Sequence, residues 1–178
     1  MELGWGQPLG AIVQFAYVVE EIDEAMTRYV QRLGIGPWFV RGPFQPPAGR
    51  HRGRPSKPTV SVARAFSGHT MVELIAQHDD GPSVFHEQEG PRRYGFHHWA
   101  RLTDTFDQDL ARYAALGYEE AFFDKLPSGS RVAYVDATCD LPGMIELVEH
   151  TEAQDRFYTA LYRAAIDWDG RDPVRREG

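Results

Sequence analysis

The chain has 178 residues, 42% of them hydrophobic and 25% charged, which is an ordinary soluble globular composition for one domain or two small fused modules. A net charge of −7 excludes a general polyanion-binding surface, so nucleic acid is not an expected partner. The single cysteine, Cys139, excludes an intramolecular disulfide, and we read neither an export signal nor a membrane-spanning apolar run, so we expect a cytoplasmic protein without a membrane partner.

The first half of the chain predicts a strand, a helix, a loop and two further strands. Residues 12–19 are apolar and β-rich, whereas residues 22–33 carry hydrophobic side chains at helical spacing and precede a glycine in the C-cap position. Residues 41–58 hold five prolines and six basic residues, which predicts a loop or lid, although Phe39 and Val40 could open another strand before it. Residues 59–66 and 70–76 then alternate like strands.

The second half predicts the same order of elements after a polar connection over residues 78–95. A strand is expected at 97–103, a helix at 106–115, and three strands at 118–123, 130–137 and 143–149. Residues 152–168 place apolar side chains on one helical face, so a C-terminal helix should pack on this core or on a second subunit, and we expect a homodimer.

The two halves are an internal repeat. Residues 12–19 correspond to residues 96–103, and residues 71–77 correspond to residues 144–150. We therefore predict an α+β fold in one domain, residues 1–178, that contains two tandem βαβββ modules, 12–77 and 96–150, followed by a C-terminal helix and tail over 151–178.

Four polar residues occupy the corresponding first and last strands of the modules: Gln14, Glu73, His98 and Glu146. Two carboxylates, an imidazole and an amide oxygen form a suitable ligand set for a divalent cation. Strand alternation places His98 in the register of Gln14 and puts His97 on the opposite face. Alternatively, either glutamate could form a structural ion pair with Arg64 or Arg131, and Gln14 could simply hydrogen-bond in the core.

Several sequence motifs resemble those of the vicinal oxygen chelate superfamily, in the branch that contains glyoxalase I and methylmalonyl-CoA epimerase. They are Val18-Val19, Gly95-Phe96-His97-His98 and the segment from Pro142 to Glu149, and the resemblance covers residues 12–150. It implies an open, barrel-like eight-stranded sheet with a central cleft, and metal ligands at Gln14, Glu73, His98 and Glu146. The epimerases usually have histidine first and glutamine second, whereas Gln14 and Glu73 here are similar to the pattern of one glyoxalase I group.

The leading functional hypothesis is a metal-dependent lyase or isomerase that removes a proton next to a carbonyl and stabilises an enediolate on a divalent ion. Glu146 or Glu73 would be the catalytic base, and the ion could be Zn, Ni, Co, Mn, Mg or Fe. The expected partner is a small-molecule substrate, either anionic or a thioester. The alternatives are a metal-free protein that sequesters a drug-like or aromatic ligand, and a ring-cleaving dioxygenase, whose pattern needs two histidines and one carboxylate on iron.

The predicted 41–58 loop carries a basic cluster: Arg50, His51, Arg52, Arg54 and Lys57. These side chains could bind a carboxylate, a phosphate or coenzyme A, or could simply be solvated.

Overall fold

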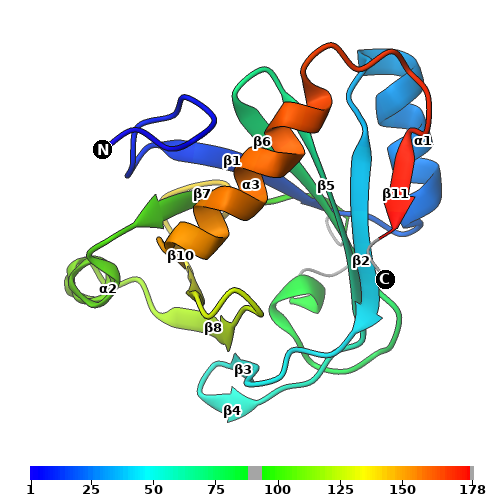
Figure 1. Ribbon diagram of the computed structural model, residues 1–178. Helices are drawn as coiled ribbons and strands as arrows, with labels where there is room; N and C mark the ends of the chain where they lie inside the picture. Colours follow the sequence, from blue (N-terminus) through cyan, green and yellow to red (C-terminus); the bar gives the residue numbers. More distant parts are fainter. Residues whose placement is uncertain (88–93, 177–178) are drawn as a thin grey trace.

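In the computed structural model, which describes residues 1–87 and 94–176, each half of the chain folds as a strand, a helix and three further strands (Figure 1). The first half contributes β1 (Ile12–Val18), α1 (Ile22–Leu33), β2 (Trp38–Phe44), β5 (Val60–Ser67) and β6 (Thr70–Gln77). The second half contributes β7 (Gly95–Thr103), α2 (Phe106–Ala115), β8 (Glu120–Lys125), β9 (Arg131–Val135) and β10 (Met144–Glu149). The 3₁₀ helix η1 (Val84–His86) precedes the second half, and α3 (Glu152–Ala165) follows it.

Three short strands lie at the sheet edges, β3 (Arg50–His51), β4 (Arg54–Pro55) and β11 (Val174–Arg176). All strands form one open mixed sheet in the order β11-β2-β5-β6-β1-β7-β10-β9-β8-β3-β4. The two halves meet where β1 and β7 pair antiparallel, and each of these strands has the last strand of its own half, β6 or β10, as its parallel neighbour. The α+β class and the open sheet are as expected. The four strands at the centre of the sheet are therefore the first and last strands of the two halves.

The sheet has eleven strands rather than eight, because the described chain adds β3 (Arg50–His51), β4 (Arg54–Pro55) and β11 (Val174–Arg176). The prediction of a loop over residues 41–58 was therefore wrong in part. Its first residues continue β2, and a short β3–β4 hairpin inside it pairs with the edge strand β8. Prolines do not prevent such short edge pairings.

The C-terminal helix is shorter than the predicted 152–168. It ends at Ala165 because Ile166 adopts an extended backbone and Asp167 has a φ of 57°. The chain beyond it turns back and adds β11 to the edge strand β2. Within the described residues, no helix is long and apolar enough to cross a membrane.

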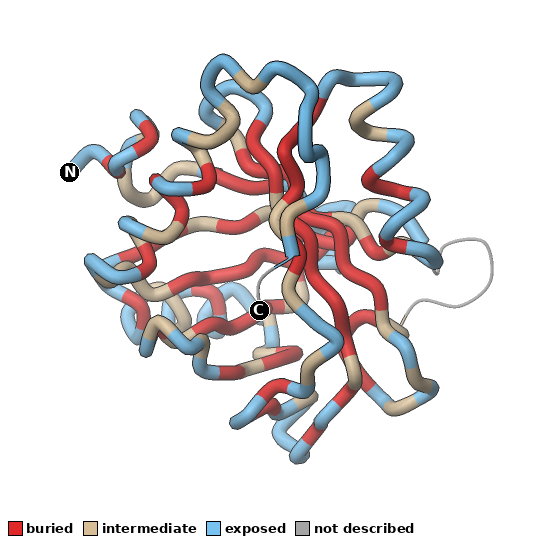
Figure 2. The backbone as a smooth tube through the Cα atoms, turned by 45° about the vertical axis from the view of Figure 1, so that its right-hand side comes forward, coloured by how far each residue is buried: buried red, intermediate tan, exposed pale blue. Residues whose placement is uncertain are grey.

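The helices cover both faces of the curved sheet (Figures 1 and 2). On the outer face, α1 packs on the first half and α2 on the second, each over its own apolar cluster. On the inner face, α3 and the N-terminal segment cover one end, with Trp5, Tyr158 and Leu161 buried against strand residues such as Phe66 and Val148. The buried residues concentrate along the central strands, between these layers.

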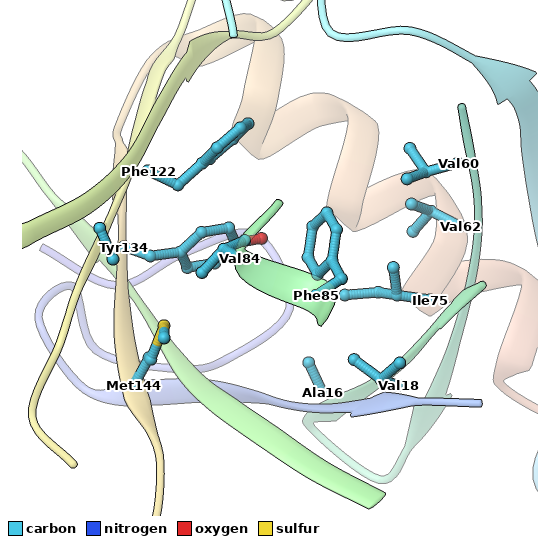
Figure 3. Packing of buried hydrophobic residues seen from close by; sticks show 11 residues of the cluster. Ala16, Val18, Val60, Val62, Ile75, Val84, Phe85, Phe122, Tyr134 and Met144 are labelled. Carbon is cyan, nitrogen blue, oxygen red and sulfur yellow. The ribbon is translucent and has the colours of Figure 1, made fainter. Parts of the chain in front are cut away.

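The other end of the inner face is filled by η1. Val84 and Phe85 lie between Val62 and Ile75 of the first half and Tyr134 of the second (Figure 3). The expected cleft between the modules is thus covered by the chain's own apolar side chains at both ends.

Candidate functional site

Gln14, Glu73, His98 and Glu146 converge at the centre of the inner face, between the apolar groups of η1 and those of α3. They come from β1, β6, β7 and β10, the four central strands. All four are buried, with residue exposures between 0 and 7%. The site is therefore shared by the two halves of the chain, each of which supplies one residue from its first strand and one from its last.

Strand registers bring these side chains together. Glu73 lies opposite Ala16 on β1, and Glu146 lies opposite Ala100 on β7. Both alanines are fully buried, and their small side chains leave room beside each carboxylate on the inner face. A glutamate on the last strand thus lies opposite an alanine on the first strand in both halves. The internal repeat of the sequence therefore places two equivalent carboxylates in the site.

The distances between the polar atoms fit a small divalent cation. The amide nitrogen Nε2 of Gln14 lies 3.2 Å from Glu73 Oε2, 3.2 Å from His98 Nε2 and 3.3 Å from Glu146 Oε2. His98 Nε2 lies 3.3 Å from Glu146 Oε2 and 3.6 Å from Glu73 Oε2. Atoms that surround a tetrahedral zinc ion at about 2.0–2.2 Å are separated from one another by roughly 3.3–3.6 Å.

Hydrogen-bond counting also favours a cation. Three acceptors, the two carboxylates and His98 Nε2, face the Gln14 amide, which has only two N–H groups to donate. An amide is nearly symmetric in shape, so rotation of the Gln14 side chain would turn its oxygen to the centre instead. Glu73, His98 and Glu146 then offer three ligand atoms within 4.8 Å of one another, and Gln14 a fourth. These residues fit a divalent ion.

Each glutamate has a cross-strand partner behind it. Arg64 on β5 lies opposite Glu73, and its Nε is 2.7 Å from Glu73 Oε1, which leaves Oε2 directed at the centre. Tyr134 on β9 lies opposite Glu146 and hydrogen-bonds its carboxylate. The ion pair with Arg64 therefore coexists with the four-residue cluster, because it uses the other carboxylate oxygen.

The charges of the site follow from burial. Desolvation raises the pKa of Glu146 to about 7, against the opposing effects of Arg64 and of hydrogen bonds from Tyr134 and Gln14. Desolvation also raises the pKa of Glu73, although the neighbouring Arg64 acts in the opposite direction. Burial lowers the pKa of His98 to about 4, so its imidazole is neutral at pH 7. A neutral imidazole is the form that binds metals.

The prediction that His97 lies on the opposite face was wrong. Ala16 pairs with His98 but Tyr17 pairs with Phe96, so His97 is the extra residue of a β-bulge, which breaks the alternation of the strand. The His97 ring is 4% exposed, packs against Phe85 and Tyr134, and its Nδ1 lies 2.9 Å from His98 Nδ1.

The hydrogen bonds of His97 fix the tautomers of both rings. His97 Nε2 lies 3.0 Å from the Val84 carbonyl oxygen, which can only accept, so Nε2 carries the proton. Burial lowers the pKa of His97 to about 3, so the ring is neutral and its Nδ1 accepts from His98 Nδ1–H. The lone pair of His98 is therefore on Nε2, the atom that faces Gln14 and the two glutamates.

The other predicted candidates have different partners. Arg131 pairs with Glu149 and Asp107, not with either central glutamate. In the basic cluster, Arg52 pairs with Glu87 and Asp136, His51 with Glu87, and Arg50 with Glu120. Three of the five basic residues thus bind acidic side chains of this chain. Of the histidines in the described residues, His98 alone belongs to the cluster, whereas a dioxygenase pattern needs two.

Sequence reasoning did not identify Tyr134, the Val84 carbonyl or the role of His97. Tyr134 could have been found from strand register. In each half, the strand that precedes the glutamate strand, β5 or β9, places one residue directly opposite the carboxylate. The Val84 carbonyl could not, because its position depends on η1 folding back onto the sheet.

Comparison with known proteins agrees with this architecture. The family model described as Glyoxalase/Bleomycin resistance protein/Dioxygenase superfamily matches residues 13–134. A search of curated proteins gives no significant match.

Solved structures share the fold at low sequence identity. The hypothetical protein BH1468 from Bacillus halodurans C-125 superposes with a TM-score of 0.57 at 17% identity, over 80% of this chain and 96% of that one. Methylmalonyl-CoA epimerase from Mycobacterium tuberculosis gives 0.56 at 17% identity, over 83% and 91% of the two chains. A single-residue variant of Streptomyces coelicolor methylmalonyl-CoA epimerase, solved with 2-nitronate-propionyl-CoA, gives 0.54 at 16% identity, over 82% and 97%.

The family match covers more than half of the chain and includes three of the four central strands. The protein therefore belongs to the Glyoxalase/Bleomycin resistance protein/Dioxygenase superfamily.

Proposed function

We propose that the protein is a metal-dependent lyase or isomerase that removes a proton from a carbon next to a carbonyl group. The observation that carries the proposal is the convergence of Gln14, Glu73, His98 and Glu146, with ligand-like spacing, at one buried point. A divalent ion held by these residues would supply Lewis-acid stabilisation of the negative charge that develops on the carbonyl oxygen.

Glu146 is the better candidate for the base. Its cross-strand partner is the neutral Tyr134, whereas Glu73 is paired with Arg64, which favours the ionised, less basic carboxylate. In the metal-free protein burial raises the pKa of Glu146 to about 7, and a raised pKa suits a base that works near neutral pH. The Glu146 side chain is also more exposed than that of Glu73, 10% against 3%, so a substrate can approach it more readily.

Glu73 then serves as a fixed ligand. The Arg64 guanidinium holds Oε1 and leaves Oε2 for the centre, which defines the rotamer of the carboxylate before anything binds. The hydrogen bond to His97 likewise fixes the orientation of the His98 ring before anything binds. The Gln14 amide, in contrast, can rotate. These three residues would hold the metal ion in position, and Glu146 would accept the proton from the substrate.

The epimerases among the structural neighbours support this reaction class, and one of them was solved with methylmalonyl-CoA. The substrate itself need not be the same. We expect a small molecule that is anionic or a thioester, and the pairing of Gln14 with Glu73 argues against methylmalonyl-CoA as the natural substrate.

Two measurements test the proposal. Protein purified without chelator is analysed for bound metal, and exchange of the proton next to the carbonyl is followed by NMR in D₂O with methylmalonyl-CoA and with the hemithioacetal of methylglyoxal as probes. We expect His98→Ala to lose the metal, because it removes a ligand. We expect Glu146→Gln to keep much of the metal but to slow exchange by about 100-fold or more, as for loss of a general base.

The exposed carboxylate of Glu119 provides the matched control, and Glu119→Gln should change neither quantity. Wild-type protein that holds no metal and takes up neither Zn²⁺, Ni²⁺, Co²⁺ nor Mn²⁺ would rule out the proposal in favour of a metal-free binding protein.

A further inference from the structure

A second feature of the inner face is a cavity of about 390 Å³ beside α3. Its walls are Arg41 of β2, Arg64 of β5, the β8–β9 turn and the first half of α3, and the residues that line it are Arg41, Arg64, Leu126, Pro127, Ser128, Ala153, Gln154, Phe157 and Tyr158. The volume is within the range of small-molecule sites in proteins, roughly 300–1,000 Å³.

The polar lining of this cavity is positive. It contains two arginines and no aspartate or glutamate, although the protein as a whole is acidic. Within the described residues, Arg41 forms no ion pair, and its guanidinium rests on the Phe44 ring at 4.3 Å. The rest of the lining is largely apolar, with Leu126, Pro127 and Phe157. This combination of a cationic and an apolar wall suits an amphiphilic anion.

Arg64 connects the cavity to the four-residue site. Its Nε faces Glu73, which is its one ion-pair partner in the described chain, yet its side chain is 18% exposed and lines the cavity. An arginine guanidinium has five N–H donors in a planar fork, so it can bind Glu73 on one edge and a second carboxylate on another. Tyr158, also in the lining, is close enough to Arg64 and both glutamates to interact with them electrostatically.

We propose that this cavity binds the carboxylate of a small organic acid, with Arg41 and Arg64 as its charged contacts and the apolar wall of Leu126 and Phe157 around its carbon chain. The inference deepens the proposed function, on which it rests, by naming the substrate class: a small carboxylic acid whose carboxylate binds Arg64, the residue that also pairs with Glu73 of the four-residue site.

The cavity alone is tested first, on metal-free protein and with simple acids. Calorimetric titration with hexanoate should give a dissociation constant in the millimolar range or tighter, as expected for a ligand of about eight heavy atoms. Hexanamide has the same shape without the charge and should bind at least about tenfold more weakly.

Two variants locate the binding. Arg41→Gln removes one cation without touching the four-residue site, and should weaken hexanoate about tenfold while leaving hexanamide unchanged. Ala153→Trp should obstruct the cavity for both ligands. Arg54→Gln, in the exposed β3–β4 hairpin, is the matched control and should bind hexanoate like the wild type.

Absence of hexanoate binding, equal binding of acid and amide, or acid binding that survives both Arg41→Gln and Ala153→Trp would each overturn the inference. Zn²⁺ uptake by the same preparations is measured separately. Zn²⁺ uptake without acid binding would contradict only the inference about the cavity. Acid binding without uptake of any divalent metal would contradict the proposed function and, with it, the assignment of the acid as substrate.

Discussion

Single hydrogen bonds determine which atom of His98 faces the centre. The chain of contacts runs from the Val84 carbonyl through His97 to His98 Nδ1 and ends at His98 Nε2. Such outer contacts fix the orientation of a metal-binding imidazole, and their loss typically costs about 10- to 100-fold in metal affinity.

We predict that His97→Phe weakens Zn²⁺ binding by about tenfold or more, because the aromatic ring is retained but its acceptor nitrogen is lost. His98→Ala should weaken it further, since it removes a ligand. His97→Gln, whose amide can both donate and accept, should recover part of the affinity. Competition titration with a chromophoric chelator measures all three. Equal affinity in His97→Phe and wild type would show that His97 does not position His98.

Glu146 makes the stability of the metal-free protein depend on pH. Its pKa rises from an ordinary value of 4.5 to about 7 because burial disfavours the charged carboxylate. Between these values the folded state holds a proton that the unfolded chain has lost, so the contribution of Glu146 to stability should fall as pH rises through this window. Above about pH 7 the loss is complete, and it is on the order of 3 kcal/mol for a shift of this size.

We therefore predict that, with chelator present, urea unfolding shows the stability of the wild type falling relative to that of Glu146→Gln as the pH rises from 5 to 7, since His97, His98 and Glu73 contribute to both proteins alike. The variant should be the more stable protein at pH 8. A wild type and a variant with parallel pH profiles would mean that Glu146 ionises normally in the folded protein.

At the scale of elements, η1 joins the two halves from inside. Phe85 is 7% exposed and packs against Phe122, Tyr134 and the His97 ring. The same short helix places the Val84 carbonyl on His97. Packing of the connecting segment and orientation of the site are thus coupled.

We predict that Phe85→Ala lowers the free energy of unfolding by about 3 kcal/mol, the usual cost of removing a buried phenylalanine side chain. Phe85→Leu should cost less, since most of the volume is kept. Leu116→Ala, at a position 61% exposed, is the control and should change stability by less than about 0.5 kcal/mol. Denaturant titration measures each, and a loss below about 1 kcal/mol for Phe85→Ala would contradict the packing of η1.

Regular elements could be predicted from the sequence, but their irregularities could not. Helical spacing predicts α1 and α2 within their observed bounds, because an amphipathic face repeats over several turns. The repeat also predicts which four residues meet. The bulge at His97, in contrast, depends on how β7 pairs with β1, and the β3–β4 hairpin depends on the edge of β8. Both are set by contacts between distant segments, which local patterns do not encode.

At the scale of the molecule, the two halves share one sheet and one buried cluster, so we expect them to unfold together. Trp38 lies in the first half and Trp99 in the second, so tryptophan fluorescence and far-UV circular dichroism of the wild-type protein should report the same denaturation midpoint. Zn²⁺ at about 100 times its dissociation constant should raise the free energy of unfolding by about 2.7 kcal/mol and should therefore shift both midpoints equally. Two separate transitions would show that the halves are independent units.

The antiparallel pairing of β1 with β7 relates the two halves by an approximate twofold axis, and identical halves would give the centre two equivalent sides. The two sides differ here, because Gln14 in the first half corresponds to His98 in the second. Likewise, the residue behind Glu73 is an arginine, whereas the residue behind Glu146 is a tyrosine. A planar, deprotonated substrate at the axis would meet a neutralised carboxylate on one face and a basic one on the other. Divergence between the repeats thus makes the two sides of the centre inequivalent, so that in the proposed reaction the proton would be removed and returned at the face next to Glu146.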